Sequence, residues 1–164
     1  MQQQLHPKAV WLFFLRSIFL LSVLFLFPGI YLFITIGRWV ALPSFLWPLL
    51  LIVPLFMIVF AWVWAKLSYR FYRYEFADNG FKKELGVIWK KYVTIPYDRI
   101  QNIDIYRGIL ARILGLSDVH IQTAGSSNPY AYGEGKLPGL SKEAAEQLRD
   151  ELLKRAKESR SQGL

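Results

Sequence analysis

The stretch that decides the fold runs from Val10 to Ala65 and reads VWLFFLRSIFLLSVLFLFPGIYLFITIGRWVALPSFLWPLLLIVPLFMIVFAWVWA. Leu, Ile, Phe, Val and Trp make up most of it, and the first acidic residue of the chain is Glu75. A bilayer core of roughly 30 Å needs about 20 consecutive apolar residues per helix. The stretch is therefore long enough to cross a membrane twice, with spans predicted over residues 10–36 and 42–65.

Charged and helix-breaking residues interrupt the stretch at a few places. Arg16 lies within the first span, and neither span contains an acid to pair with it. We therefore favour an arginine that reaches the lipid headgroups over an intramembrane functional charge. Pro28–Gly29 predicts that the first helix kinks or ends early, and Gly37–Arg38 is the predicted turn. Pro48 and Pro54 predict kinks or weakened hydrogen bonds in the second span.

Charge and composition exclude several classes of function. The net charge is +8, but the excess lies mostly in the first 74 residues, next to the apolar spans. That placement is typical of a membrane-topology signal and not of a nucleic-acid surface. The chain has no cysteine and only two histidines, which excludes disulfides and disfavours a metal cluster. We expect no nucleic-acid partner, no metal and no cofactor.

Basic residues flank the two ends of the predicted hairpin unequally. Arg38 lies at the turn, whereas five basic residues lie where the chain enters and leaves: Lys8, Arg16, Lys66, Arg70 and Arg73. The positive-inside rule places the more basic end in the cytoplasm. We therefore expect a multi-pass cell-membrane protein with both termini cytoplasmic, in which residues 1–65 form a transmembrane hairpin and residues 66–164 a cytoplasmic domain.

The second part of the chain shows the pattern of short antiparallel strands. Ser68–Ala77 alternates apolar and charged residues, and Asp78–Asn79–Gly80 is a strong hairpin turn. A short helix or turn is bracketed by Gly108 and Gly115. Further strands are predicted over Phe81–Leu85, Ile88–Ile95, Arg99–Tyr106 and Asp118–Thr123.

A single helix is predicted to close the chain. Ala124–Gly139 reads as a loop rich in Gly, Ser, Asn and Tyr, and Ser141 is the predicted N-cap of the helix that follows. Apolar residues recur along one helical stripe, at Ala145, Leu148, Leu152 and Ala156. The order of elements predicts a strongly curved antiparallel sheet closed by one C-terminal amphipathic helix.

Three segments carry a resemblance to a known family. They are YRYEFADNGFKKELGVIWKKYVTI (72–95), IPYDRIQNIDIYRGILARILGLSDVHIQTAG (95–125) and LPGLSKEAAEQLRDELL (137–153). Together with two preceding apolar spans, they resemble the bacterial pleckstrin-homology-like (PH-like) membrane proteins of the YdbS-like family. The resemblance implies a PH-like, partly open antiparallel β barrel with a C-terminal α-helix. Members are associated with the cell envelope, and some with resistance to antimicrobial peptides.

Three sets of residues are candidates for recognition. Lys66, Arg70 and Arg73 are predicted to contact anionic lipid at the membrane surface. Arg99, Gln101 and Arg112 form either a polar recognition site or, as we favour, a structural network with nearby aspartates. Asn128, Tyr130 and Tyr132 are predicted to form a partner-binding loop.

Two further residues are unusual for their positions. Lys83 shares a strand face with apolar Phe81 and Leu85, which predicts either a sheet edge or a wet barrel mouth that would suit a binding groove. His120 lies mid-strand on the face opposite Val119, and we interpret it as an ordinary half-exposed histidine.

These patterns together favour a binding protein. We expect a non-catalytic, membrane-anchored PH-like scaffold of the cell envelope that contacts membrane lipids and works as a homo-oligomer or with a related membrane protein. An accessory subunit of an exporter or channel is the alternative. An enzyme is less favoured, because no nucleophile elbow or phosphate-binding glycine loop occurs in the sequence.

Overall fold

The computed structural model of the chain describes residues 3–37, 49–123 and 135–162. Two compact units are present. The β unit consists of Met1–Leu12 and Ser68–Leu164, and the helical unit consists of Phe13–Leu67. Residues 3–12, which the sequence pattern grouped with the hairpin, therefore fold with the second part of the chain.

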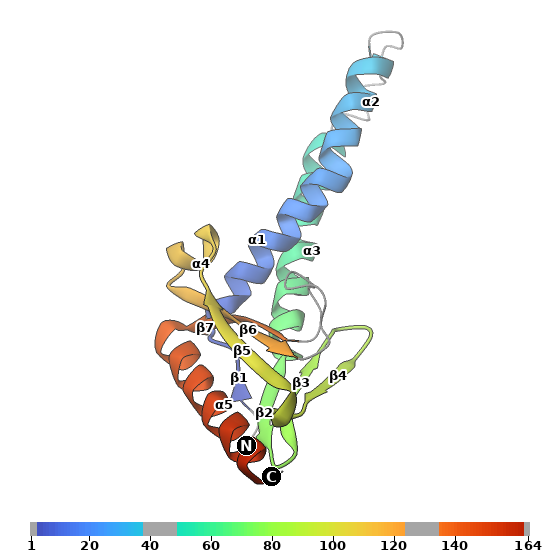
Figure 1. The fold of residues 1–164 in the computed structure, drawn as a ribbon. Coiled ribbons are helices and arrows are strands. Elements are labelled where there is room, and N and C mark those ends of the chain that lie inside the picture. Colours follow the sequence, from blue (N-terminus) through green and yellow to red (C-terminus); the bar gives the residue numbers. More distant parts are fainter. Residues whose placement is uncertain (1–2, 38–48, 124–134, 163–164) are drawn as a thin grey trace. The chain divides into compact units, whose positions relative to one another are not determined.

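The N-terminal half of the apolar stretch is helical without a break. α1 (Ala9–Leu21), the π-helix η1 (Ser22–Leu26) and α2 (Phe27–Gly37) follow one another (Figure 1). Pro28 has no N–H, and its ring crowds the carbonyl four residues earlier. The wider π turn lies directly before it, where the N–H of Phe27 donates to the carbonyl of Ser22. Of the two alternatives predicted for Pro28–Gly29, a kink or an early end, the early end is wrong, because α2 continues through the proline to Gly37.

The second apolar helix is α3 (Leu49–Arg70), and it continues through Pro54. The rings of Phe14 and Trp62 meet edge to face with centroids 5.5 Å apart, which connects α1 to α3. Met57, Ala61 and Ala65 are buried at intervals of four residues and so form one stripe of α3. Arg38 of the predicted turn and Pro48 lie outside the described residues.

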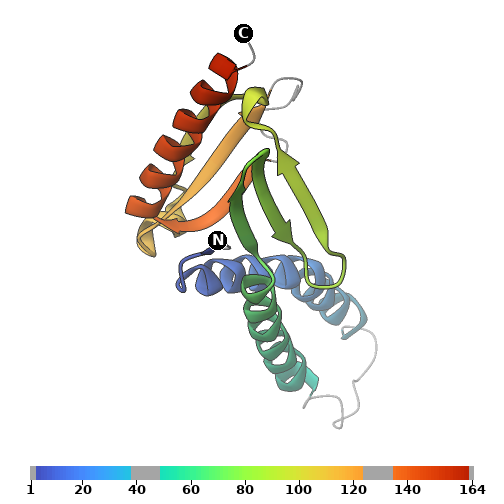
Figure 2. The ribbon, with the colours of Figure 1, turned by 90° about the horizontal axis from the view of Figure 1, so that it is seen from below.

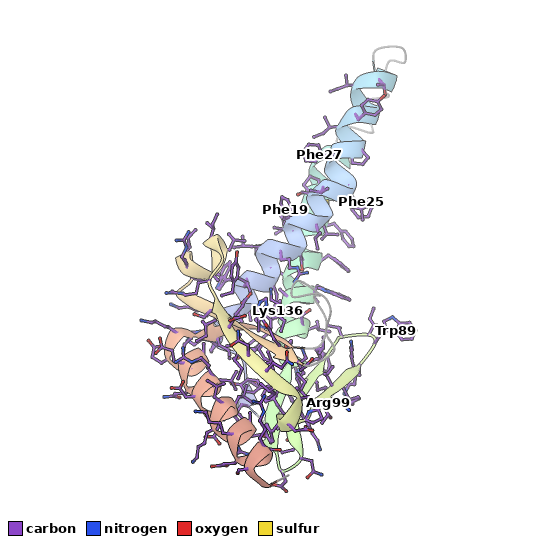
Figure 3. The ribbon with its side chains drawn as sticks, in the orientation of Figure 1. Phe19, Phe25, Phe27, Trp89, Arg99 and Lys136 are labelled. Carbon is purple, nitrogen blue, oxygen red and sulfur yellow. The ribbon has the colours of Figure 1, made fainter. Side chains whose placement is uncertain are left out.

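The remaining surface of both helices is apolar. Ala9–Tyr31 and Ile52–Arg70 are each long and apolar enough to cross a membrane. Large side chains such as Phe19, Phe25 and Phe27 are exposed and point away from their helix (Figure 3). Soluble monomers rarely expose apolar surface on this scale, so these helices carry the surface expected of membrane spans.

The first sheet of the β unit is antiparallel, with the strand order β1-β2-β3-β4. Its strands are β1 (Gln3–Gln4), β2 (Arg73–Ala77), β3 (Gly80–Leu85) and β4 (Lys91–Ile95). The predicted hairpin turn at Asp78–Asn79–Gly80 is confirmed, since Ala77 pairs with Gly80 and Arg73 with Glu84. Tyr74 and Phe81 are buried on one face of this sheet.

The second sheet is also antiparallel, with the order β5-β6-β7. Its elements in chain order are the 3-10 helix η3 (Tyr97–Arg99), β5 (Ile100–Tyr106), α4 (Ile109–Ile113), β6 (Leu116–Thr123) and β7 (Lys136–Ser141). The predicted short helix after Gly108 is confirmed as α4. β7 begins inside the segment predicted to be loop. A bulge in the pairing of β6 with β7, at Asp118, accommodates Gly139.

The last element is α5 (Lys142–Gln162), which packs against β5, β6 and β7 (Figures 1 and 2). Its predicted N-cap is confirmed, because the Ser141 Oγ accepts the N–H of Ala144 at 3.1 Å. The predicted stripe is buried throughout: Ala145, Leu148, Leu152 and Ala156. The expected antiparallel fold with a C-terminal helix is therefore confirmed. The strands form two separate sheets, whereas a partly open barrel was predicted.

Several strand boundaries differ from their predictions, most of all at the starts of β2 and β4. The strand predicted from Ser68 is β2, and it begins at Arg73 because α3 continues to Arg70. The third strand begins at Lys91 and not at Ile88. Trp89, which the prediction included in this strand, lies in the loop before it and is 86% exposed. Gly86 opens this loop with a φ of +109°, where a side chain would collide with the carbonyl of Trp89.

Candidate functional site

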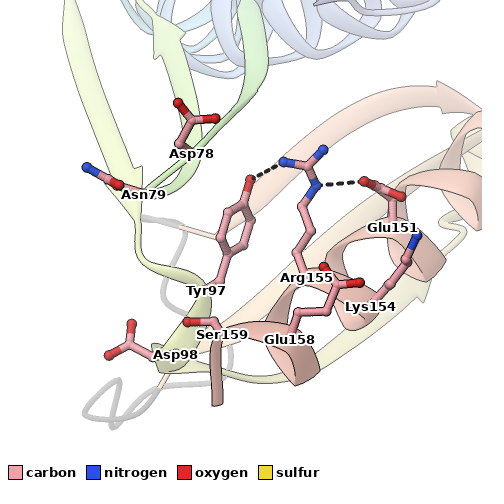
Figure 4. Close-up of a pocket in the computed structure, with 9 residues that line it drawn as sticks. All are labelled: Asp78, Asn79, Tyr97, Asp98, Glu151, Lys154, Arg155, Glu158 and Ser159. Atoms are coloured by element: carbon pink, nitrogen blue, oxygen red, sulfur yellow. Dashed lines mark hydrogen bonds and ion pairs between the residues drawn. The ribbon is translucent and has the colours of Figure 1, made fainter. Parts of the chain in front are cut away.

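A polar groove of about 660 Å³ lies at the end of the β unit formed by the β2–β3 turn, η3 and the C-terminal half of α5 (Figure 4). Three segments that are distant in sequence thus meet at one place. The lining residues are Asp78, Asn79, Tyr97, Asp98, Glu151, Lys154, Arg155, Glu158 and Ser159. The groove is large enough to hold several side chains of a bound polypeptide.

Tyr97 and Arg155 form the fixed centre of the groove. The Tyr97 hydroxyl donates to the carbonyl of Ala77 at 2.9 Å and accepts from Arg155 Nη1 at 3.4 Å. Arg155 Nε donates to Glu151 Oε1 at 2.6 Å (Figure 4). The guanidinium carbon also lies 5.1 Å from the ring centroid of Phe76, within the range of a cation–π contact. Partial burial raises the pKa of Tyr97, so its hydroxyl stays protonated and available as a donor.

The charge of the groove is acidic although the chain as a whole is basic. Four carboxylates line it, against the two cationic side chains Lys154 and Arg155. Arg155 is already bound to Glu151, so the remaining carboxylates are Asp78, Asp98 and Glu158. Such a surface favours lysine, arginine or N–H donors of a partner. Across the described ranges, no group of three or more His, Cys, Asp or Glu residues is arranged to hold a metal ion.

A second polar group connects the two sheets inside the β unit. Lys83 is 3% exposed, and its Nζ donates to the carbonyl of Lys136 at 2.9 Å. The Tyr72 hydroxyl donates to the same carbonyl at 2.8 Å. Burial and the charge of Asp118 raise the pKa of Tyr72, which keeps this donor protonated. The predicted edge position of Lys83 is wrong, because β3 lies between β2 and β4.

Asp118 extends this group to the bulge of the second sheet. Its Oδ2 lies 3.1 Å from Lys136 Nζ, and its Oδ1 accepts the N–H of Gly139 at 3.0 Å (Figure 3 labels Lys136). Both oxygens of a buried carboxylate are thus bonded, which is the condition under which a buried charge stabilises a fold. The role of this group is therefore structural.

His120 lies next to this charged group on the central strand β6. Its ring centroid is 6.1 Å from that of Tyr106, and its Nε2 is buried with no hydrogen-bond partner among the described residues. Burial lowers the pKa of His120, and the positive charge of Lys136 lowers it further. The half-buried position agrees with the interpretation of an ordinary strand histidine.

The predicted membrane-contact residues lie at and just beyond the end of α3. Lys66 is exposed, and its Nζ lies 5.2 Å from the ring centroid of Trp62, one helical turn earlier. Arg70 and Arg73 are also exposed, at the last turn of α3 and the first position of β2. Their contact with lipid remains a prediction.

The second predicted set is not assembled into a site, and the third cannot be placed on the described residues. Arg99 belongs to η3, before β5, whereas Arg112 belongs to α4, after β5, so a full strand separates them. Gln101 is exposed on β5 itself. Two of the nearby aspartates bond to other groups: Asp104 accepts from Gln122, and Asp118 accepts from Gly139. The third set, Asn128, Tyr130 and Tyr132, lies outside the described residues.

Comparison with known proteins assigns the family. The family described as Bacterial PH domain matches residues 10–156, which is most of the chain. The chain belongs to this family. The match runs from α1 to α5, so this bacterial PH domain includes both apolar helices as well as the two sheets.

Two curated relatives of this bacterial PH domain come from Bacillus subtilis (strain 168). The UPF0699 transmembrane protein YdbT is 28% identical over 109 residues, which is 65% of this chain and 22% of YdbT. The UPF0699 transmembrane protein YdbS is 27% identical over 100 residues, 61% of this chain and 58% of YdbS. The aligned region thus spans less than two thirds of either relative. No solved structure matches the chain significantly.

The groove was not among the sites predicted from sequence. Arg155 was predicted only as part of the C-terminal helix, and Tyr97 only as part of the segment 95–125 that carries the family resemblance. A usable signal is the two acids that flank Arg155 at Glu151 and Glu158, at helical spacings of four and three residues.

Proposed function

We propose that this protein is a non-catalytic, membrane-anchored binding protein whose PH-like β unit is held at the membrane surface. One observation carries the proposal: the β unit is built from both flanks of the apolar helices. β1 pairs with β2, and Leu5 and Ala9 are buried before α1 leaves the unit. On the other side, β2 begins three residues after α3 ends at Arg70. With both connections this short, membrane insertion of the helices would fix the unit at the bilayer surface.

Membrane insertion is supported by the helices and by the relatives. Both helices are apolar and exposed over a length that matches a bilayer, and both curated relatives are named transmembrane proteins. In the proposed topology the helices cross twice, as a hairpin. The basic residues at their β-unit ends, among them Lys8, Lys66 and Arg70, support an orientation with the β unit and both termini in the cytoplasm.

The alternative of an exporter or channel subunit has less support. A conducting path needs polar groups that face it. In the described part of the helices, the Ser22 hydroxyl bonds to the carbonyl of Phe19, and the Thr35 hydroxyl to that of Tyr31. These two hydroxyls bond within their own helix, so they fit packing better than transport.

The proposed partner is a polypeptide with basic side chains that binds the acidic groove. This partner is either a second copy of the chain or a related membrane protein, so the two form a membrane complex. From the family resemblance, we propose that the complex acts in envelope stress or in resistance to antimicrobial peptides. The bacterial PH domain family is not typically catalytic, which agrees with a binding role. The groove supplies hydrogen-bond acceptors at fixed positions, and the carboxylates of Asp98 and Glu158 supply negative charge.

Co-purification tests this proposal. The full-length protein and the variant Asp98→Lys/Glu158→Lys are purified from native membranes in mild detergent, and bound proteins are identified by native mass spectrometry. Glu146→Lys is the matched control, since Glu146 is exposed on the same helix outside the groove. We expect the groove variant to lose a partner that the control retains. A strictly monomeric protein without partners, or a partner unaffected by the groove variant, would contradict the proposal.

A further inference from the structure

Two apolar protrusions of the β unit are exposed among the residues that the structure describes. The first is the loop between β3 and β4, where Ile88 is 70% and Trp89 86% exposed (Figure 3). The second is α4, where Ile109 is 71% and Ile113 76% exposed, while Ala111 is the residue buried against the sheet. We propose that both protrusions insert into the interfacial layer of an anionic bilayer, which rests on the membrane anchoring proposed above.

The β3–β4 loop lies where the chain leaves α3. Lys90 Nζ is 5.8 Å from the ring centroid of Phe71, the residue directly after the last residue of α3. The same amine pairs with Glu84 Oε1 at 3.0 Å, and Glu84 pairs in the sheet with Arg73. The loop that carries Trp89 is therefore held beside the connection through which the chain leaves the second apolar helix.

α4 lies on the side of the β unit where α1 begins. Its chain continues through Gly115 into Leu116, which pairs with Ser141 at the end of β7. Gly139 lies two residues earlier on β7, and its carbonyl accepts the N–H of His6 at 3.2 Å. The Cα of Gly139 packs against Ala9 at the start of α1. Each protrusion thus borders one of the two points at which the β unit joins the apolar helices.

The chemistry of both protrusions fits a lipid headgroup layer. Tryptophan is the residue most typical of the membrane–water interface, and isoleucine side chains add apolar surface that can enter the acyl boundary. Exposed cations lie beside each protrusion, with Lys91 after Trp89 and Arg112 within α4. Cations at this level attract anionic lipids. The apolar side chains are divided between two sites with a cation at each, and this arrangement favours a bilayer over one contiguous protein interface.

Site-directed spin labelling tests the inference in the full-length protein. The chain has no cysteine, so Trp89→Cys and Ile113→Cys each provide a single label. The labelled proteins are reconstituted, one chain per particle, into nanodiscs of phosphatidylcholine and phosphatidylglycerol. Collision rates with oxygen, which partitions into lipid, and with a water-soluble nickel chelate are then measured. Ser159→Cys in the groove and Phe19→Cys on α1 are the aqueous and membrane controls.

We expect the ratio of oxygen to nickel accessibility at positions 89 and 113 to be several-fold higher than at position 159. A water-like ratio at both positions, with a membrane ratio at position 19, would overturn the inference while leaving the anchoring intact. Low accessibility to both reagents would mean that protein covers the protrusions, and this also overturns it. A water-like ratio at position 19 would contradict the anchoring itself. Ile109→Cys provides a second label on α4 if Ile113→Cys does not fold.

Discussion

Gly139 and Ala9 pack so closely that no side chain fits between them. A Cβ added to Gly139 would lie 2.6 Å from the Cβ of Ala9, and Gly139 has a φ of +71°. The carbonyl of the same glycine accepts the N–H of His6, so β7 holds the segment that leads into α1. This contact holds the start of α1 to the β unit, whose second strand, β2, begins more than sixty residues later.

Gly139→Ala is expected to destabilise the β unit by about 2–4 kcal/mol, because positive φ costs about 1–2 kcal/mol and overpacking about 1–3 kcal/mol. The midpoint of thermal unfolding in detergent, followed by tryptophan fluorescence, measures the loss. Gly115→Ala is the matched control, since Gly115 has a φ of +70° with no atom within 4 Å of the added Cβ.

The two variants separate backbone strain from the contact with Ala9. Gly115→Ala should show the smaller, backbone part alone. Ala9→Gly combined with Gly139→Ala should recover part of the difference, because the closest neighbour of the new methyl group is then removed. Equal losses in Gly115→Ala and Gly139→Ala would show that the docking of α1 does not depend on this contact.

Asp118→Ala is expected to destabilise the protein by about 2–4 kcal/mol. The substitution leaves the N–H of Gly139 and the largely buried Lys136 amine without the carboxylate that both now contact. Chemical denaturation in detergent measures the effect. Asp150→Ala is the matched control. Its carboxylate lies 3.0 Å from Arg149 at the exposed surface, so its loss should cost under about 1 kcal/mol of stability. Similar losses for the two variants would refute the buried-network interpretation.

The stability of the protein should fall as the pH drops below 6.5, the ordinary pKa of histidine, because of His120. Its pKa is lowered in the folded state, so the unfolded chain binds the proton first and acid favours unfolding. The stabilising contribution is complete above pH 6.5 and is lost as the pH falls through the folded-state pKa. His120→Gln should therefore flatten the dependence of the unfolding midpoint on pH in this window. An unchanged slope in the variant would exclude His120 as its origin.

The sequence correctly predicted those elements that depend only on a few neighbouring residues. The hairpin turn needs only Asp78–Asn79–Gly80, and the helix start needs only the Ser141 hydroxyl, so both were visible in sequence. β7 was missed because Pro138 and Gly139 are typical of loops. Here the bulge opposite Asp118 accommodates them, and that depends on a different strand. Trp89 was misplaced because alternation alone cannot show where a strand ends and its loop begins.

The candidate groove depends on long-range geometry and was therefore missed. Tyr97 and Arg155 are 58 positions apart, and the carbonyl of Ala77 that fixes the tyrosine comes from a third segment. Arg99 and Arg112, by contrast, are close in sequence but lie at opposite ends of β5. Closeness along the chain predicted a cluster there, and the extended strand between them prevents it.

The most direct test of the central claim maps which side of the membrane each end of the helices occupies. Single cysteines are placed at Gln3, Gly37 and Lys157 in the cysteine-free chain, and a membrane-impermeant maleimide is added to bacterial spheroplasts before and after permeabilisation. Our account predicts that Gly37→Cys is labelled in intact spheroplasts, whereas Gln3→Cys and Lys157→Cys are labelled only after permeabilisation. Labelling of Lys157→Cys in intact spheroplasts, or one common pattern at all three positions, would contradict a membrane hairpin that holds the β unit on the cytoplasmic side.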